Sequence, residues 1–298
     1  MARNSAAPDY AYSFRKAHNL PLHAFESQGP RTDHQDRVCA FRVNADGIDE
    51  TQLHEIFAAL AKGTADMHRA SGATVNLALV GNGQVIAGNI GDGMTSIFSR
   101  AKGERKLQGQ RLSTTHNPYN PNEMKRLEPT LDPFGVYVSN GLLCLNDGMR
   151  SPYLMMTRAL GQHQYGEAVA KTPSEIHTTA MNADDLNIYA LTLYSDGAIR
   201  VADDWGVDFD VEIDIYAREG LSPRARIDKP MALHIGEFAS RQGLTDDTSI
   251  LSLDLRHLKP EDRLLLGVFD GNGNEGAAYA EKAVEILADH PLTLQRVL

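Results

Sequence analysis

Two apolar runs around an Asn-Gly pair restrict the fold of this 298-residue chain more than any other feature of its sequence. The runs are Thr74–Val80 and Val85–Ile90, and Asn82-Gly83 lies between them. Asn and Gly both accept the positive φ angles of a tight hairpin turn, and β-branched residues are frequent in strands. The sequence therefore predicts a long antiparallel hairpin and a sheet that contains it.

Further apolar patterns predict both helices and strands. A stripe at helical spacing follows Asp49 and includes Leu53, Ile56, Phe57 and Leu60. Because strands do not alternate one-for-one with helices, we expect an α+β fold with antiparallel sheets and not a doubly wound parallel sheet. The other expected helices are Met231–Arg241 and Ala277–Leu287, and the other expected strands are Thr95–Arg100, Gly135–Ser139, Leu142–Leu145, Ile188–Tyr194, Ser249–Leu255 and Leu264–Phe269.

The chain shows no clear division into domains. Residues 1–24 mix polar residues, Pro and aromatics without a period, so we expect a poorly ordered lead-in. Residues 203–230 are acidic and then Pro-rich and basic, which is typical of a surface excursion. No internal repeat or linker is evident in the remainder. The sequence therefore predicts a single domain over residues 25–298.

The composition excludes several classes of protein. A formal net charge of -10 argues against binding to nucleic acid or to an anionic membrane, because both need clustered Lys and Arg. The N-terminus lacks the apolar stretch of a signal peptide, and no apolar run is long enough to span a membrane. Cys39 and Cys144 have no CxxC spacing and are expected to be reduced core residues. We expect a cytoplasmic protein, or one delivered to a host cytosol without a cleavable signal.

Four strand-like segments end in an aspartate beside a small residue. A carboxylate at the end of a buried strand can bind Mg²⁺ or Mn²⁺, which prefer oxygen ligands. Asp-Gly after a strand is also a common turn signal, so independent turns on an unrelated α+β protein are an open alternative. The segments are Ile90–Gly93, Tyr194–Gly197, Leu244–Thr248 and Phe269–Gly271, and a fifth polar cluster, Arg31–Asp36, precedes the apolar run Val38–Val43.

The order of these segments resembles that of the metal-dependent protein phosphatases of the type-2C (PPM) family. The resemblance is colinear from Gly29 to about Leu255. It implies an antiparallel β-sandwich flanked by helices, in four layers (α-β-β-α). The residues that match family motifs are Arg31–Asp36, Ser71–Thr74, Asn89–Asp92, Leu112–His116, Asn120–Glu123, Thr157–Gly161, Ser195–Gly197 and Asp246–Ser249.

The resemblance also implies two Mg²⁺ or Mn²⁺ ions and a third, weaker one. Asp270 would bridge the first two ions, and the carbonyl of Gly271 would be a further ligand. The remaining ligands would be Asp196 and Asp246 at the first ion, Asp36 at the second, largely through water, and Asp92 at the third.

Arg31 would clamp the substrate phosphate, because its planar guanidinium suits two phosphate oxygens. The reaction implied by the family is direct attack on phosphorus by a hydroxide that bridges the ions, without a phosphoenzyme. The substrate implied is a protein that carries phosphoserine or phosphothreonine. Specificity would reside in surface loops and in a flap after Gly161.

One family element stands at an unusual place in the chain. The family's strand, Asp-Gly-His-Gly loop and first helix normally follow the strand of Asp36, but the matching residues here are Leu264–Leu287. We therefore hypothesise that this segment is relocated, and we expect its strand to lie beside the strand that follows Asp36. Exchange of this strand between two copies of the chain would give the same contacts. Asp46, followed by Gly47, is the rival for the bridging aspartate.

Two substitutions at the expected site bear on activity. Asn272 stands where many family members have a His that donates a proton to the leaving group, and an amide cannot act as that acid. His116 is a candidate substitute for the missing acid. Gln35 replaces a common Glu, which is the milder change. An inactive scaffold that keeps the fold and binds partners is therefore the alternative to an active phosphatase.

Overall fold

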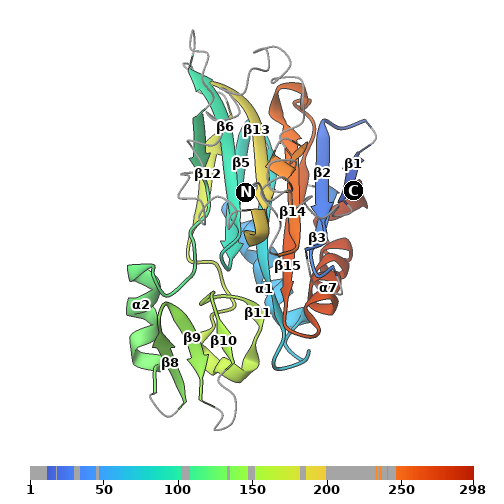
Figure 1. The fold of residues 1–298 in the computed structure, drawn as a ribbon. Coiled ribbons are helices and arrows are strands. Elements are labelled where there is room, and N and C mark those ends of the chain that lie inside the picture. The colour runs from blue at the N-terminus through green and yellow to red at the C-terminus, as the bar shows by residue number, and fades with distance from the viewer. Residues whose placement is uncertain are drawn as a thin grey trace, which may run out of the picture.

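The structure is a computed structural model with two large antiparallel sheets, a small third sheet and flanking helices (Figure 1). This arrangement confirms the prediction of an α+β fold with antiparallel sheets. The structure describes residues 12–17, 19–29, 34–44, 47–101, 108–132, 135–146, 152–181, 186–198, 232–233, 235–236, 240 and 246–298.

The first large sheet begins earlier in the chain than the sequence predicts. β1 pairs along its length with β2, and β2 pairs in turn with β14. The expectation of a poorly ordered lead-in over residues 1–24 is therefore wrong for residues 12–17 and 19–24, because Leu22 and Ala24 are buried in the sheet. In sheet order the strands are β1 (Tyr12–Lys16), β2 (Leu22–Ser27), β14 (Thr248–Asp254), β13 (Leu186–Tyr194), β6 (Met94–Ala101) and β7 (Gln108–Arg111).

The second large sheet contains the predicted hairpin. Asn82 and Gly83 have φ angles of 50° and 73°, which is the geometry that the hairpin turn requires. A short strand, β11 (Leu160–Gly161), also pairs with β4. In sheet order the main strands are β12 (Ile176–Ala180), β5 (Gln84–Ile90), β4 (Gly72–Gly81), β15 (Leu264–Asn272), β3 (Arg37–Val43) and β16 (Thr293–Arg296).

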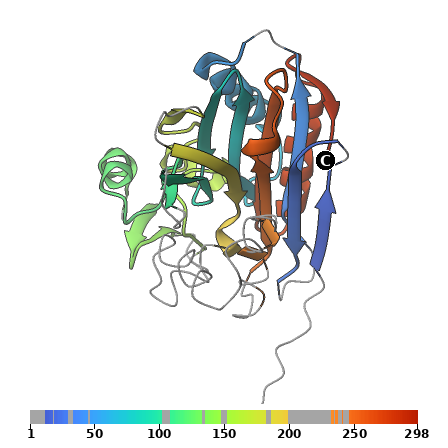
Figure 2. The same cartoon turned by 90° about the horizontal axis from the view of Figure 1, so that it is seen from above.

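The two large sheets face each other across a shared hydrophobic core (Figure 2). Successive side chains of a strand point to opposite faces, and β15 follows this rule. Leu264, Leu266 and Val268 contribute to the core between the sheets. Leu265 and Phe269 belong to a second core on the other face of the second sheet. β15 is therefore buried on both faces, which explains its nearly continuous apolar sequence.

Two helices cover the outer face of the second sheet and contact each other. They are α1 (Glu50–Gly63) and α7 (Gly276–Ala288). α1 begins after Asp49, whose side chain accepts a hydrogen bond from the backbone N–H of Gln52 at 2.9 Å. The side chain of Gln52 accepts one from the backbone N–H of Asp49 at 3.0 Å, which completes a capping box. The predicted helical stripe is buried as expected: Leu53, Ile56, Phe57 and Leu60.

The outer face of the first sheet is covered in part by the segment expected to be helical over residues 231–241. Ala232 and Ile235 are helical and belong to one apolar cluster with Phe25 and Ile250 of the sheet. The rest of that segment, except Leu233, Gly236 and Ser240, lies outside the described residues, as does the expected excursion over residues 203–230. None of the helices formed by the described residues is long and apolar enough to cross a membrane.

A small third sheet lies at one end of the molecule with α2 (Pro121–Leu127), apart from the two large sheets (Figure 1). Its strand order is β10 (Tyr153–Leu154), β9 (Leu142–Leu145) and β8 (Val136–Ser139). It has its own apolar cluster, which includes Leu127, Leu143 and Tyr165. Short 3-10 helices occur at Glu128–Thr130, His163–Ala168 and Leu255–His257.

Both cysteines are free and buried, as predicted. Burial raises the pKa of the Cys39 thiol to about 12, so this thiol stays protonated near neutral pH. A protonated thiol is a poor nucleophile and metal ligand, which agrees with a purely structural role for Cys39.

β15 comes from near the C-terminus but fills the middle of the second sheet. It pairs with β3 on one side, where Val268 lies opposite Val38, and with β4 on the other, where Asp270 lies opposite Thr74. The expectation that the last apolar strand lies beside the strand that follows Asp36 is thus confirmed. The pairing occurs within one chain.

We expect Leu266→Ala to lower the free energy of unfolding by about 2–5 kcal/mol, because a fully buried side chain between the two sheets would leave a cavity. Chemical denaturation measures this difference. Glu285→Ala, which removes an exposed ion pair with Lys282, is the control and should cost about 0.5 kcal/mol or less. Equal small losses in both variants would contradict the central place of β15.

Candidate active site

Asp36 and Asp270 lie at the same end of two neighbouring strands. Phe269 of β15 lies opposite Arg37 of β3 in an antiparallel pair. Asp270, the next residue of β15, therefore lies beside Asp36, which directly precedes β3. Both continue the alternation that faces the other sheet. Asp36 is fully buried and Asp270 is 9% exposed. The fold therefore places two carboxylates at one end of the space between the sheets.

Asp196 reaches the same region from the opposite sheet. It follows β13, where the hydroxyl of Ser195 accepts a hydrogen bond from the backbone N–H of Ser249 at 2.9 Å. The backbone N–H of Ser195 donates in turn to the carbonyl of Ser249 at 2.9 Å. These two bonds fix the end of β13 to β14, and Asp196 follows directly with 6% of its surface exposed.

Asp246 and Asp247 lie against the turn that follows Asp196. A Cβ at Gly197 would lie 2.0 Å from the carbonyl oxygen of Asp247, so only glycine allows this close approach. Asp246 accepts a hydrogen bond from the backbone N–H of Asp247 at 2.9 Å, and both residues are buried. The chain thus brings a further pair of acids to the same end of the sandwich.

Asp247 has a role that the sequence did not reveal. Its Oδ1 accepts a hydrogen bond from the backbone N–H of Gly29 at 2.9 Å, and its Oδ2 accepts one from the backbone N–H of Gln35 at 2.7 Å. These bonds bracket the segment that carries Arg31, which itself lies outside the described residues. The signal in the sequence is the doublet Asp246-Asp247, in which the family resemblance gives a role only to Asp246.

The electrostatics show that these acids share one region. Burial raises the pKa of Asp36 to about 8, and the charges of Asp247 and Asp196 act in the same direction. Burial also raises the pKa of Asp270, together with the charges of Asp36, Asp196 and Asp92. Burial and the charges of neighbouring carboxylates from separate parts of the chain therefore disfavour the ionisation of Asp36 and of Asp270.

The chemistry of this cluster fits a hard divalent cation, although its side chains do not converge as a finished ligand set. In the described part of the chain, no group of three or more Asp, Glu, His or Cys side chains is arranged so that it could hold a metal ion. Yet the donors are carboxylate oxygens, and both buried oxygens of Asp36 lack a hydrogen-bond partner among the described residues. A cation would satisfy these oxygens and offset the repulsion between the acids.

The last residues of β15 and the turn that follows them are packed tightly against their surroundings. A Cβ at Gly271 would lie 2.4 Å from the carbonyl carbon of Gly276, so the chain requires glycine there. The side chain of Gln35 donates to the carbonyl of Gly273 at 3.0 Å. Asn272 accepts a hydrogen bond from the side-chain amide of Gln162. This amide pair occupies the position at which the family resemblance implied a proton donor.

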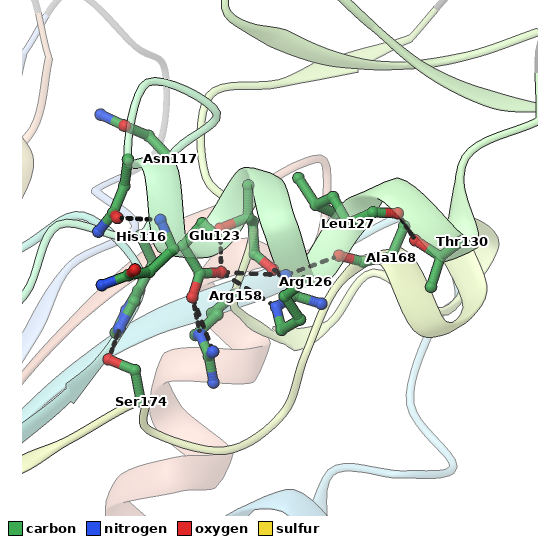
Figure 3. A network of polar contacts seen from close by, with 12 residues as sticks. His116, Asn117, Glu123, Arg126, Leu127, Thr130, Arg158, Ala168 and Ser174 are labelled. Atoms are coloured by element: carbon green, nitrogen blue, oxygen red, sulfur yellow. Dashed lines mark hydrogen bonds and ion pairs between the residues drawn. The ribbon is translucent and has the colours of Figure 1, made fainter.

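His116, the candidate substitute for that donor, is held as a neutral ring. Its Nδ1 accepts a hydrogen bond from the backbone N–H of Gly91 at 3.1 Å, and its Nε2 lies 2.6 Å from the hydroxyl of Ser174 (Figure 3). The Nδ1 contact assigns the proton to Nε2. Burial lowers the pKa of His116 to about 4, and the charge of Arg158 adds to this effect. His116 therefore positions Gly91, the residue before Asp92.

A buried ion-pair network lies next to His116 and joins α2 to the residues before β11 (Figure 3). Glu123 accepts hydrogen bonds from Nε and Nη2 of Arg158 at 2.9 and 2.7 Å. It also accepts bonds from Thr157 at 2.7 Å and from Arg126 at 3.0 Å. Burial opposes ionisation of Glu123, but these partners hold its pKa below the ordinary value. The matched motifs Asn120–Glu123 and Thr157–Gly161 thus form one structural unit.

The predicted site residues divide into three groups. Asp36, Asp92, Asp196 and Asp270 lie close enough for their charges to interact. Asp246 is buried beside Asp247, and Gly271 follows Asp270 within β15. Arg31 and the rival Asp46 lie outside the described residues. The ligand roles assigned to these residues stay predictions.

Comparison with known structures identifies the type of fold. A serine-threonine phosphatase 2C from Toxoplasma gondii is 16% identical, with a TM-score of 0.53 over 83% of this chain and 99% of that chain. A sex determining protein of C. elegans is also 16% identical, with a TM-score of 0.51 over 83% of this chain and 67% of that chain. No curated protein sequence matches the chain.

The family follows from the sequence itself. A family model described as Protein phosphatase 2C matches residues 24–204, which is more than half of the chain. The chain therefore belongs to the protein phosphatase 2C family. The alternative of unrelated turns on another α+β protein is thereby excluded.

The burial of His116 predicts a pH dependence of stability. Between about pH 6.5 and pH 4 the unfolded chain binds a proton at His116 and the folded protein does not, so stability falls as pH decreases through this range. The loss attributable to His116 should be roughly 3 kcal/mol. We expect His116→Gln to lose less unfolding free energy than the wild type between pH 7 and pH 4.5.

Chemical denaturation at several pH values measures this difference. Ser174→Ala is the matched control, because it removes the partner of Nε2 and keeps the imidazole. Its pH dependence should follow that of the wild type. Identical pH dependence in His116→Gln and the wild type would contradict the neutral, buried state of this histidine.

Proposed function

We propose that this protein is a phosphatase that hydrolyses phosphoserine and phosphothreonine in proteins with the help of Mg²⁺ or Mn²⁺. Membership of the protein phosphatase 2C family supports the phosphatase activity. The observation that carries the metal dependence is the convergence of acids on Asp270: burial and the charges of Asp36, Asp196 and Asp92 raise its pKa. Four acids from distant parts of the sequence meet at one end of the β-sandwich. This gathering of like charges does not stabilise the fold by itself.

In this proposal the acids divide between the ions as the family resemblance implies. Asp196 and Asp246 would hold the first ion, Asp36 would hold the second, and Asp92 a third. Asp270 would bridge the first two, with the carbonyl of Gly271 beside it. When bound, such ions lower the pKa of a coordinated water and offset the negative charge of a phosphate.

The chain's own residues supply the rigidity that such a site needs. Asp270 lies in β15, which is paired on one side with β3 and on the other with β4. Asp36 directly precedes β3, and the backbone of the adjacent Gln35 is bound to Asp247. Strands hold side chains more rigidly than loops do, and a site that binds metal and substrate needs its ligands held in precise positions.

Arg31 is proposed to bind the phosphate of the substrate. The two ends of its segment, Gly29 and Gln35, are bound to the carboxylate of Asp247 next to the acidic cluster. A guanidinium delivered there would meet the phosphate by paired hydrogen bonds, and its charge would compensate the acids.

We also infer that Leu264–Leu287 takes the place of a family segment that normally lies nearer the N-terminus. Support comes from the position of β15 between β3 and β4. A relocated strand serves equally well if it fills the same slot of the sheet, because pairing depends on position in space and not on order along the chain.

The inactive scaffold has no support in the comparisons, so the active enzyme is preferred. The amide pair of Asn272 and Gln162 lacks an acidic proton, and His116 is held neutral by two partners. Protonation of the leaving group is then left to solvent, which affects rate more than it affects binding.

Asp196→Ala should reduce Mn²⁺-dependent release of phosphate from a phosphothreonine peptide by at least about a hundredfold, because it removes a proposed metal ligand. A phosphate-release assay with Mn²⁺, or with a chelator in its place, measures the effect. Asp289→Asn alters an exposed carboxylate after α7 and is the control that should retain activity. Undiminished release in Asp196→Ala would refute the proposal.

Asp270→Asn should stabilise the metal-free protein while weakening its response to metal. The raised pKa of Asp270 means that its ionised form is unfavourable in the folded state, so stability falls as pH rises and a neutral amide removes this cost. Thermal unfolding with and without Mn²⁺ tests both effects. Saturating metal stabilises a protein by about 2.7 kcal/mol at a hundredfold excess over Kd.

The wild type should therefore gain thermal stability with Mn²⁺, and Asp270→Asn should gain less. Asp289→Asn should behave as the wild type in both conditions. No stabilisation of the wild type by millimolar Mn²⁺ would count against the metal site and in favour of a scaffold.

A further inference from the structure

Asp92 lies in a turn, residues 91–93, whereas Asp270 lies in a strand. Gly91 has a φ angle of 112°, in the region that favours glycine. A Cβ at Gly91 would lie 2.4 Å from the Cβ of Thr74, the residue opposite Asp270 in the sheet. The position of Asp92 therefore depends on the contacts that hold this turn in an uncommon conformation.

One residue, His116, binds both backbone groups of Gly91. Its Nδ1 accepts a hydrogen bond from the N–H of Gly91 at 3.1 Å, and its own backbone N–H donates to the carbonyl of Gly91 at 3.1 Å. The side chain of Asn89 donates to the same carbonyl at 3.1 Å. His116 is fully buried, so these bonds are formed away from water. They fix the peptide bonds on both sides of Gly91, and the second of these leads directly to Asp92.

The ring of His116 is held from its other side as well (Figure 3). Its Nε2 lies 2.6 Å from the hydroxyl of Ser174, and its backbone carbonyl accepts a hydrogen bond from the N–H of Thr157 at 2.8 Å. Because Nδ1 accepts from Gly91, Nε2 carries the proton and donates to Ser174. Rotation of the ring about its Cβ–Cγ bond would replace Nδ1 by a carbon. The partners of His116 therefore select the ring orientation that binds Gly91.

The other end of the turn lies against the opposite sheet. A Cβ at Gly93 would lie 2.1 Å from Nδ2 of Asn76, which donates to the carbonyl of Tyr194 at 3.2 Å. Tyr194 precedes Asp196 by two residues. Contacts at both ends of the turn thus determine where Asp92 lies relative to Asp196, and His116 makes those at the first end.

We propose that His116 is a positioning residue for Asp92 and that it thereby sets the affinity of the protein for the third, weaker metal ion. The inference rests on the proposed function, in which Asp92 binds that ion. In this role His116 does not touch the ion, because it acts through the backbone of Gly91. Partners that hold metal ligands in place commonly change metal affinity by about ten- to a hundredfold when they are removed.

Two substitutions of His116 separate this hydrogen bond from the bulk of the ring. His116→Leu keeps an apolar side chain and removes the acceptor for Gly91. His116→Asn keeps an acceptor, because the Oδ1 of asparagine can occupy the place of Nδ1. Neither variant keeps a group in the place of Nε2, so the contact with Ser174 is lost in both. A difference between the two variants therefore reports on the bond to Gly91.

Calorimetric titration of the metal-free protein with Mn²⁺ measures the effect. We expect the Kd of the weaker ion to rise at least about tenfold in His116→Leu and to stay within about threefold of the wild type in His116→Asn. The Kd values of the two tighter ions should change by less than about twofold in both variants. Equal losses in His116→Leu and His116→Asn would overturn the proposal.

Combination with Asp92→Asn shows whether His116 acts through Asp92. Asp92→Asn should abolish the weaker binding step, which identifies that step with Asp92. His116→Leu should then cause no further change in Mn²⁺ binding when it is added to Asp92→Asn. A further loss of the tighter ions in the double variant would overturn the proposal, because His116 would then support the site by another route.

Leu127→Ala is the control for general destabilisation. Leu127 is fully buried in the apolar cluster of the small third sheet and α2, and its truncation leaves a cavity. This variant should lose stability and keep the Kd of the weaker ion. If Leu127→Ala weakens that ion as much as His116→Leu does, the effect is general destabilisation and the proposal fails.

Hydrogen exchange on the metal-free wild type tests the contact even if His116→Leu does not fold. The amide of Gly91 should be protected, and its rapid exchange would overturn the proposal. A wild type that binds no Mn²⁺ and releases no phosphate would refute the proposed function and this inference with it. Phosphate release with two tighter ions, together with a weaker ion that does not respond to His116→Leu, would refute this inference alone.

Discussion

The pairing of β15 between β3 and β4 is the constraint on which the rest of the structure depends. It completes the second sheet, contributes to the cores on both faces, and carries Asp270 to the end of the strand next to Asp36. Because strand register fixes side-chain direction, a shift of one residue would turn Asp270 toward the helices and leave the cluster without its central acid. The same hydrogen bonds therefore hold the fold together and determine the chemistry of the site.

Local patterns in the sequence were sufficient to predict most of the helices and strands. Asn82-Gly83 has the positive φ angles that its turn requires, and Asp49 with Gln52 forms the capping box that starts α1. The aspartates near strand ends were also recognisable, because Asp beside a small residue after an apolar run is a local pattern in the sequence. What brought them into one site was the family order of the motifs, and not any single motif by itself.

Contacts between distant residues account for what the sequence could not show. β1 and β2 are short, and they join the sheet because β2 pairs with β14, more than two hundred residues away. Asp247 was indistinguishable from an ordinary turn residue, because its two partners are the backbone amides of Gly29 and Gln35. Every residue except proline has such an amide, so the sequence does not indicate which ones bind Asp247. The neutral state of His116 likewise depends on the N–H of Gly91 and on burial, neither of which its neighbours in sequence reveal.

The late position of β15 in the chain has a consequence for biosynthesis. During translation β3 and β4 emerge long before the strand that belongs between them, so the growing sheet has an empty slot and two unpaired apolar edges. The second sheet cannot close until β15 has left the ribosome. Until then the nascent chain is exposed to strand pairing with other chains.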